Sequence, residues 1–100
     1  MKVYDYYHKN QFILIDGKDV SFQSYSSEVV RIKDGVVWFG RNWDYSNTTL
    51  RHLYQFLQEY CYWLWVEIEE TKKLNKFNSY LTTINYMINN DMINYDYDII

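Results

Sequence analysis

The side chains with the most reactive chemistry in this sequence are one cysteine and two histidines. Cys61 has the thiol that a nucleophilic enzyme needs, and His8 and His52 have the imidazoles of a general base or a metal ligand. Cys61, however, falls within an apolar stripe at helical spacing, where a free cysteine usually acts as a small core residue. His8 and His52 lie far apart in the sequence, and neither has the spacing of a metal-ligand pair. We therefore expect neither a nucleophile nor a metal site.

Three glutamates that lie close together, Glu67, Glu69 and Glu70, offer carboxylates for acid–base chemistry. Lys72 and Lys73 follow them on the same predicted helical stretch, which is the usual pattern of a solvated, salt-bridged helix surface. The chain has three glycines, and none of them lies in a phosphate-binding loop or a nucleophile elbow. The sequence thus predicts a protein that is not an enzyme and that binds no cofactor or metal.

Composition and charge favour a protein partner over a nucleic acid. Aromatic residues make up 21% of the chain, with 12 Tyr and 4 Trp, and such side chains suit half-buried positions and interfaces. The net charge is −3, and it is uneven: seven bases and six acids precede residue 52, whereas three bases and seven acids lie from residue 52 onward. A duplex-binding module normally carries a basic face, whereas an acidic C-terminal half is suited to a basic protein surface.

The length of the chain predicts a single domain spanning residues 1–100. The one cysteine excludes an internal disulfide framework and is typical of a reducing cytosol. Residues 1–10 contain no apolar signal core, and the longest apolar run, residues 60–66, is too short to cross a bilayer. The abundance of Asn, Ile, Tyr and Lys indicates AT-rich coding, as in a low-GC bacterium or its phage. We expect a soluble protein in the cytoplasm of the bacterial host.

Residues 1–40 predict a small antiparallel β-meander of three to five strands. Asp16-Gly17 and Asp34-Gly35 are hairpin-turn signals within it, and Gly40 ends it. Short apolar or alternating runs supply the candidate strands at 3–8, 11–15, 20–25, 29–33 and 36–39.

Two helices are expected to follow the meander. Hydroxyl and amide residues over 46–49 are helix caps, and an apolar stripe at helical spacing then predicts one long helix over 47–74. A break near 75–78 precedes a second helix over 79–91, and an acidic, Tyr-rich tail occupies 92–100. The predicted fold class is α+β, with the N-terminal antiparallel sheet packed against the long helix and the shorter C-terminal helix.

The long helix carries a second apolar stripe, formed by Phe56, Tyr60 and Trp63. A helix with two apolar faces must cover both of them or use one for a partner. One interpretation is that the sheet covers the first stripe and the C-terminal helix covers the second. The other interpretation is a dimer or target interface through Trp63, Tyr62 and Val66.

The connection between the meander and the long helix, WDYS at 43–46, is predicted to be a structural joint. Asp44 precedes the capping residues, where a carboxylate is favourable at the helix N-terminus. Trp43 and Tyr45 are expected to pin the start of the helix onto the sheet, and Ser46 and Thr49 belong to the capping run. A ligand site at this joint is the alternative.

The tail over 94–100 alternates tyrosine with aspartate and leaves three alternatives open: a frayed terminus, a short edge strand that returns to the sheet, and a recognition tail. In the recognition tail, the acids would meet Lys or Arg of a partner and the tyrosines would anchor it. The candidate partner-binding residues combine this tail with the second half of the long helix. They are Tyr62, Trp63, Glu67, Glu70, Tyr95, Asp96, Tyr97 and Asp98.

Two stretches, SYSS at 24–27 and WDYSNTTLRHLYQFL at 43–57, resemble a group of short uncharacterised proteins from phages and mobile elements of Gram-positive bacteria. These proteins share roughly S-Y-x-S, a hairpin, and W-D-Y-S-x-T-T-x-x-[HY]-L-x-x-F-L, and the resemblance covers about residues 22–60. The group has no assigned chemistry, so the resemblance implies no site residue. Its genomic setting implies an anti-defence role, with an anti-CRISPR-type inhibitor of an RNA-guided DNA nuclease as the leading expectation.

The leading function is therefore a non-enzymatic protein that binds and inhibits a host defence protein. A nuclease carries basic grooves for phosphate, which acids interleaved with tyrosine would occupy, and both DNA mimicry and steric or allosteric blocking are open. One alternative is a nucleic-acid-binding accessory or regulatory protein that uses Arg31, Lys33, Arg41 and Arg51. Another alternative is a homodimeric structural phage protein joined through Trp63.

Overall fold

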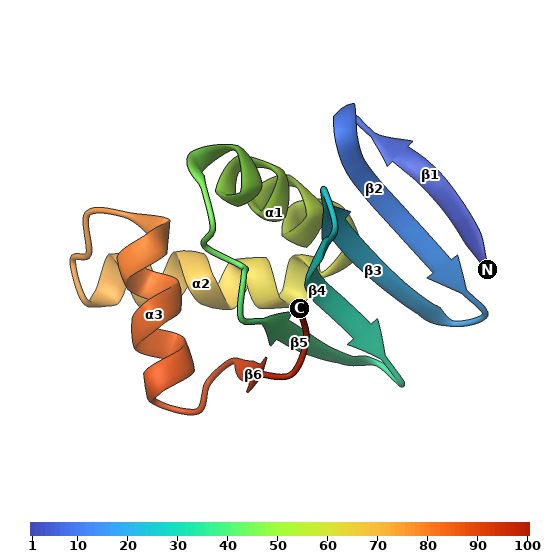
Figure 1. Ribbon diagram of the computed structural model, residues 1–100. Coiled ribbons are helices and arrows are strands. Elements are labelled where there is room, and N and C mark those ends of the chain that lie inside the picture. Colours follow the sequence, from blue (N-terminus) through green and yellow to red (C-terminus); the bar gives the residue numbers. More distant parts are fainter.

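Five antiparallel strands form the N-terminal part of the fold in the computed structural model, which describes all 100 residues (Figure 1). Each strand pairs with the next one along the chain, so the predicted meander is confirmed. Asp34 and Gly35 both have positive φ, 52° and 78°, which is the backbone of a tight hairpin turn. The strands are β1 (Lys2–Tyr6), β2 (His8–Asp16), β3 (Asp19–Ser24), β4 (Ser27–Lys33) and β5 (Val36–Gly40).

Three helices follow the meander and lie on one side of the sheet (Figure 1). They are α1 (Asn47–Tyr60), α2 (Tyr62–Leu74) and α3 (Tyr80–Asn89). The α+β class is therefore confirmed, and α3 occupies most of the predicted second helix. Ser79 caps α3 by accepting a hydrogen bond on its hydroxyl from the backbone N–H of Thr82 at 3.1 Å.

The prediction of one continuous helix over 47–74 is wrong, because the helix breaks at Cys61. The backbone of Cys61, with φ −137° and ψ 50°, is not helical. Its N–H donates to the carbonyl of Leu57 at 2.9 Å, which ends α1, and its own carbonyl accepts from Leu64 and Trp65 at 3.0 Å, which begins α2. The backbone of Cys61 thus bonds to both helices, no side chain caps α2, and the apolar stripe continues through the break.

The core lies between the sheet and the helices, and α1 contacts β3 and β4. Phe56 of the second apolar stripe is fully buried, and its ring centroid lies 5.9 Å from that of Phe22 and 6.4 Å from that of Tyr6. The expectation that the C-terminal helix covers this stripe is therefore wrong for Phe56, which packs on the sheet. Trp63, at the other end of the stripe, remains 57% exposed.

The C-terminal tail returns to the sheet as a short edge strand. β6 (Asn94–Asp96) pairs with β5 in parallel, because the intervening helices bring the chain back in the same direction as β5. Beyond it, the carbonyl of Ile99 accepts a hydrogen bond from the backbone N–H of Arg41 at 3.1 Å, and the Ile99 side chain is buried. The edge-strand alternative is confirmed for 94–96, and the predicted sheet gains one parallel strand.

Close approach of the tail depends on Gly40 at the end of β5. A Cβ atom at this position would lie 2.6 Å from the carbonyl oxygen of Glu28 and 2.6 Å from the Cγ2 atom of Ile99. Glycine therefore fits here because a side chain has no room between β4 and the returning tail.

The helices of this protein are too short and too polar for any of them to span a bilayer.

Candidate functional site

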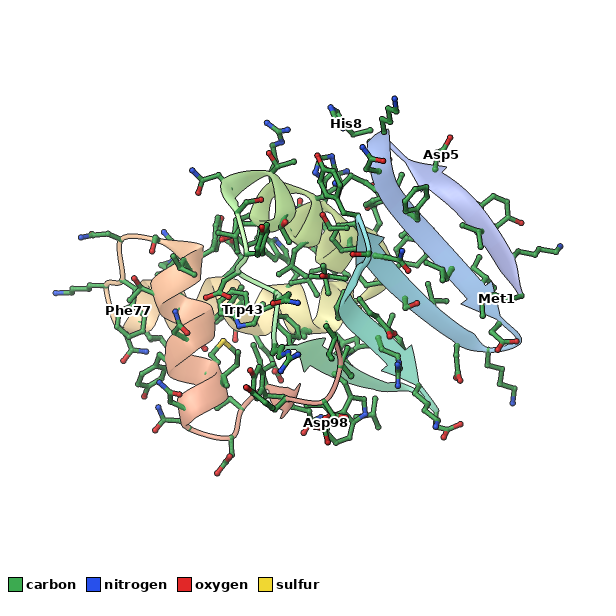
Figure 2. All side chains as sticks on the ribbon, viewed as in Figure 1. Met1, Asp5, His8, Trp43, Phe77 and Asp98 are labelled. Atoms are coloured by element: carbon green, nitrogen blue, oxygen red, sulfur yellow. The ribbon has the colours of Figure 1, made fainter.

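The joint between β5 and α1 is built by hydroxyl groups and one buried tryptophan. Ser46 has extended backbone angles, and its Oγ accepts the backbone N–H of Thr49 at 3.1 Å, so the predicted cap is confirmed at Ser46. Trp43 is buried between the helices and the sheet, with its ring 5.9 Å from that of Phe39 on β5 (Figure 2). Tyr45 is 80% exposed, so the expectation that it pins the helix is wrong. Asp44 is also exposed and does not cap the helix.

The two stretches that carry the sequence resemblance meet at this joint and form a pocket of about 510 Å³. We call it the hydroxyl pocket, because six serine and threonine hydroxyls line it, from Ser24, Ser26, Ser27, Ser46, Thr48 and Thr49. The remaining lining residues are Tyr25, Val29, Asn42 and Tyr45. No acidic or basic side chain lines the pocket.

Hydrogen bonds among these groups join the β3–β4 hairpin to α1. The hydroxyl oxygens of Ser24 and Thr49 lie 3.4 Å apart, and that of Thr49 lies 3.0 Å from the hydroxyl oxygen of Ser46. Asn42 donates from Nδ2 to the hydroxyl of Ser27 at 3.2 Å. A cavity is therefore present at the joint, where the alternative prediction placed a ligand site. The sequence alone did not indicate this cavity.

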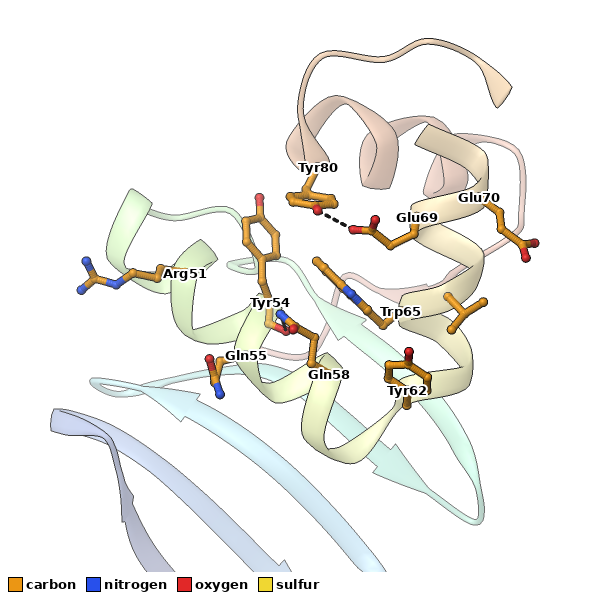
Figure 3. A pocket seen from close by; sticks show the side chains of 10 residues that line it. Arg51, Tyr54, Gln55, Gln58, Tyr62, Trp65, Glu69, Glu70 and Tyr80 are labelled. Atoms are coloured by element: carbon orange, nitrogen blue, oxygen red, sulfur yellow. Dashed lines mark hydrogen bonds between the residues drawn. The ribbon is translucent and has the colours of Figure 1, made fainter. Parts of the chain in front are cut away.

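A second cavity, the helical cleft, lies between α1 and α2 and has a volume of about 610 Å³ (Figure 3). The rings of Tyr54, Trp65 and Tyr80 pack together there, with centroid separations of 4.8 to 5.9 Å. The Tyr80 hydroxyl donates to the carboxylate of Glu69, which raises the pKa of Tyr80. The ammonium of Lys72 lies 5.2 Å from the Tyr80 ring centroid, which is a cation–π distance. The three rings therefore form a packed cluster that a lysine contacts.

A third hollow, the edge groove, lies between the start of α2 and the chain around β5 and β6 and has a volume of about 290 Å³. Its apolar lining residues are Val36, Val37, Trp63, Leu64, Met92 and Ile93. Its polar lining consists of Gly35, Asn94 and the single charged residue Glu67. Trp63, Met92 and Val36 are 57%, 46% and 40% exposed, so the groove has an apolar rim open to solvent.

The eight candidate partner-binding residues do not form one surface. Tyr62 and Glu70 line the helical cleft, whereas Trp63 and Glu67 line the edge groove. Tyr95 lines a neighbouring hollow that shares Ile93 and Asn94 with the edge groove. Of the remaining three, Asp96 is the last residue of β6, and Tyr97 and Asp98 lie in the turn that follows it.

The acids and tyrosines of the tail have structural contacts of their own. The carboxylate of Asp96 accepts the backbone N–H of Asp98 at 2.9 Å, which stabilises the turn after β6. The guanidinium of Arg41 lies 4.9 Å from the ring centroid of Tyr97, which is a cation–π distance. The tail is therefore folded onto the sheet with Ile99 buried, whereas Tyr95, Tyr97 and Asp98 of its predicted recognition surface remain exposed.

The basic residues of the nucleic-acid alternative are divided among several sites. Arg31 forms a two-pronged ion pair with Glu28, at 2.7 and 2.6 Å, which fixes its guanidinium and raises its pKa. Arg41 packs on Tyr97, and Arg51 lines the helical cleft. Lys33 and Arg31 share a hollow on the sheet, but Arg41 and Arg51 are not part of it. Arg31 and Arg41 thus already have partners within the chain, which leaves fewer free basic groups for the phosphates of a duplex.

The fold brings the two histidines together, which their positions in the sequence did not indicate. Their ring centroids lie 5.9 Å apart, and Nδ1 of the buried His52 lies 2.8 Å from the carbonyl oxygen of Thr48. No group of three or more His, Cys, Asp or Glu side chains lies close enough together to hold a metal ion. Cys61 is fully buried, and burial raises the pKa of its thiol to about 12, so it is a core residue as expected.

Comparison with known proteins identifies a family but no function. Residues 3–63 match the model of a family of unknown function, DUF8033, and the chain belongs to this family. No curated protein and no solved structure matches the chain. The matched region contains the five-stranded meander, α1 and every residue of the hydroxyl pocket, whereas the helical cleft extends beyond it.

Proposed function

We propose that this protein is a non-enzymatic phage or mobile-element protein that binds and inhibits a host defence protein in the bacterial cytoplasm, with an RNA-guided DNA nuclease as its target. The observation that carries the proposal is the exposed indole of Trp63 at the edge groove. The resemblance of 24–27 and 43–57 to phage and mobile-element proteins supplies the biological setting.

Trp63 has the character of an interface anchor. Its neighbours on α2, Leu64 and Trp65, are buried, whereas 57% of the Trp63 surface remains open to water. Tryptophan is enriched among the few residues that supply most of the binding energy of protein interfaces, because its large ring is rigid and mostly apolar. A partner side chain that covered this ring and the exposed part of Met92 would gain a substantial apolar contact.

The charge of the groove indicates the chemistry of the partner. Glu67 is its one charged lining residue, and no Lys or Arg lines it. An apolar side chain next to a lysine or arginine matches this arrangement, since the apolar group covers Trp63 and the cation pairs with Glu67. RNA-guided nucleases carry such basic segments along the channels that hold their nucleic acids.

The modest net charge favours one mode of inhibition. A DNA mimic needs many carboxylates to replace the phosphates of a duplex, and this chain has a net charge of −3. In addition, Asp96 is engaged in the C-terminal turn. We therefore propose that inhibition occurs by occupation of the target surface rather than by imitation of DNA.

The proposal is tested by measuring binding of the full chain to immobilised RNA-guided nucleases with Trp63→Ala and Glu67→Lys as the variants. We expect Trp63→Ala to weaken binding by about 30-fold, the effect of losing an interface anchor. Tyr4→Ala and Asp5→Lys are the matched controls, because both residues are exposed on β1, at the opposite edge of the sheet from β6. Binding that is equally weak for Tyr4→Ala, or unchanged in Trp63→Ala, contradicts the assignment of this groove.

A second copy of the chain is the competing occupant of the edge groove. Sedimentation of the wild type and of Trp63→Ala distinguishes the two cases. A concentration-dependent dimer that Trp63→Ala dissociates indicates a homodimeric protein and removes Trp63 from target binding. A monomer in both samples leaves the groove free for a partner of a different kind.

A further inference from the structure

We propose that the hydroxyl pocket is a binding site for a neutral carbohydrate, of the size of a monosaccharide or disaccharide. This site is separate from the edge groove and goes beyond the function proposed above. It is a cavity of about 510 Å³ in which two segments distant in the sequence converge, the β3–β4 turn and the β5–α1 joint. Ligand sites of small molecules usually have volumes of about 300 to 1,000 Å³.

The lining has the hydrogen-bonding capacity that a sugar requires. Each serine or threonine hydroxyl donates one hydrogen bond and accepts up to two, as each hydroxyl of a sugar does. Ser46, Ser24 and Thr49 use part of this capacity among themselves. The hydroxyls of Ser26 and Thr48 line the pocket without a hydrogen bond to another protein group, and the amide of Asn42 adds an oxygen acceptor.

The lining has no charged side chain, which favours a sugar over a phosphate-bearing ligand. Sites for nucleotides and nucleic acids hold phosphate oxygens with Arg or Lys, and none of these side chains lines the pocket. A carboxylate ligand has the same requirement. A neutral ligand with many hydroxyls needs no countercharge, so it is the class that this lining favours.

Two exposed tyrosines at the pocket provide surfaces for the apolar face of a sugar ring. Tyr25 is 60% exposed and Tyr45 is 80% exposed, and they approach the pocket from the two different segments. The C–H groups on one side of a pyranose ring are weakly positive, whereas the face of an aromatic ring is negative, so the two surfaces attract each other.

The backbone of Tyr25 is held in place without a ligand. Its backbone lies in the left-handed region, with φ 55°, which is uncommon for a bulky side chain. The backbone N–H of Tyr25 donates to the carbonyl of Asn10 at 2.6 Å, and its own carbonyl accepts from Nε2 of Gln23 at 2.7 Å. These two bonds fix the backbone of the turn, so the Tyr25 ring projects from an ordered position beside the pocket.

The test is a titration of the isotope-labelled full chain with cellobiose, maltose, lactose and N,N′-diacetylchitobiose, followed by amide chemical shifts. We expect at least one of these sugars to shift the amide signals of Ser26 and Thr48, with a dissociation constant of about 1 mM. Thr48→Val removes one hydroxyl at constant volume, and Tyr45→Ala removes an exposed ring. Each change is expected to weaken binding by at least about fivefold.

Two further samples keep the test decisive. Tyr25→Asn removes the ring but retains a residue that tolerates the left-handed backbone, so it preserves the turn. Tyr4→Ala removes an exposed tyrosine far from the pocket and is expected to bind as the wild type does. The assignment is overturned if none of the four sugars shifts these amides up to about 50 mM. It is also overturned if Tyr45→Ala and Tyr25→Asn both bind sugar as tightly as the wild type does. Shifts of the same amides by uridine 5′-monophosphate, with the sugars inactive, replace it with a nucleotide site.

Discussion

Ser24, at the end of β3, and Thr49, in the first turn of α1, have their hydroxyl oxygens 3.4 Å apart in the protein interior. Both residues are buried, and Thr49 also lies within hydrogen-bonding distance of Ser46, the cap of α1. Three hydroxyl groups from two segments thus form one connected chain. This contact explains why the connection before α1 is rich in hydroxyl residues: they join the helix to the hairpin as well as capping it.

Ser46→Ala is expected to lower the free energy of unfolding by about 1 kcal/mol. The substitution removes the oxygen that accepts the backbone N–H of Thr49, and an unpaired helix N-terminus is destabilising by this amount. Urea denaturation followed by circular dichroism measures the change. Ser26→Ala is the matched control, since its exposed hydroxyl makes no bond within the protein, and it should change stability by less than about 0.5 kcal/mol. Equal losses in the two variants are inconsistent with the capping role.

Gln11→Met is expected to stabilise the protein by about 1 kcal/mol. Gln11 is fully buried on β2, and no protein group lies within hydrogen-bonding distance of its amide nitrogen or oxygen. Methionine has a similar length and removes two buried polar atoms. Thermal and urea unfolding measure the gain. Gln23→Met is the comparison, because Gln23 donates to the carbonyl of Tyr25, and this variant should gain nothing. A loss of stability in Gln11→Met contradicts the expectation that the unpaired buried amide is destabilising.

The stability of the protein is expected to fall above pH 9 more steeply in the wild type than in Cys61→Ala. Burial raises the pKa of the Cys61 thiol from its ordinary 9.0 to about 12. The neutral thiol is favoured in the folded state, so the stabilisation is complete below pH 9 and is lost progressively as the pH rises from about 9 towards 12. Urea unfolding of both proteins between these pH values measures the difference. Parallel pH profiles contradict a shifted thiol pKa.

Gly40→Ala is expected to destabilise the protein by about 1 to 3 kcal/mol, because the added Cβ overlaps the carbonyl of Glu28 and the side chain of Ile99. The strain should release the C-terminal tail first. Hydrogen exchange at the backbone amides of Arg41 and Ile99 is expected to accelerate more than exchange in α1. Asn94→Ala, an exposed position on β6, serves as the control. Unchanged protection of both amides is incompatible with a tail docked against Gly40.

Local sequence patterns predicted the parts of the fold that depend on local chemistry. Asp34-Gly35 supplies the backbone angles of the β4–β5 turn, and Ser46, in the predicted capping run, caps α1. The break at Cys61 has no such signal, because no glycine or proline lies near it and the apolar stripe continues through it. β6 is only three residues long, and it is a strand because β5 offers it an edge.

The candidate sites were less predictable, because each one depends on segments that only the fold brings together. The hydroxyl pocket requires the β3–β4 turn to lie beside the first turn of α1, which neither stretch indicates alone. Tyr62 and Trp63 are adjacent in the sequence, yet they line different hollows, because successive residues of a helix point about 100° apart. The aromatic and acidic residues selected from the sequence therefore belong to more than one surface of the folded protein.

A cleavage titration measures whether the chain inhibits a defence nuclease by binding it through Trp63. A panel of RNA-guided DNA nucleases from Gram-positive bacteria is incubated with increasing amounts of wild type, Trp63→Ala or Tyr4→Ala before target DNA is added. We expect wild type and Tyr4→Ala to stop cleavage by at least one nuclease at a near-equimolar ratio, and Trp63→Ala to require about 30 times more protein. Full cleavage by every nuclease at saturating wild type, or equal inhibition by Trp63→Ala, contradicts this expectation.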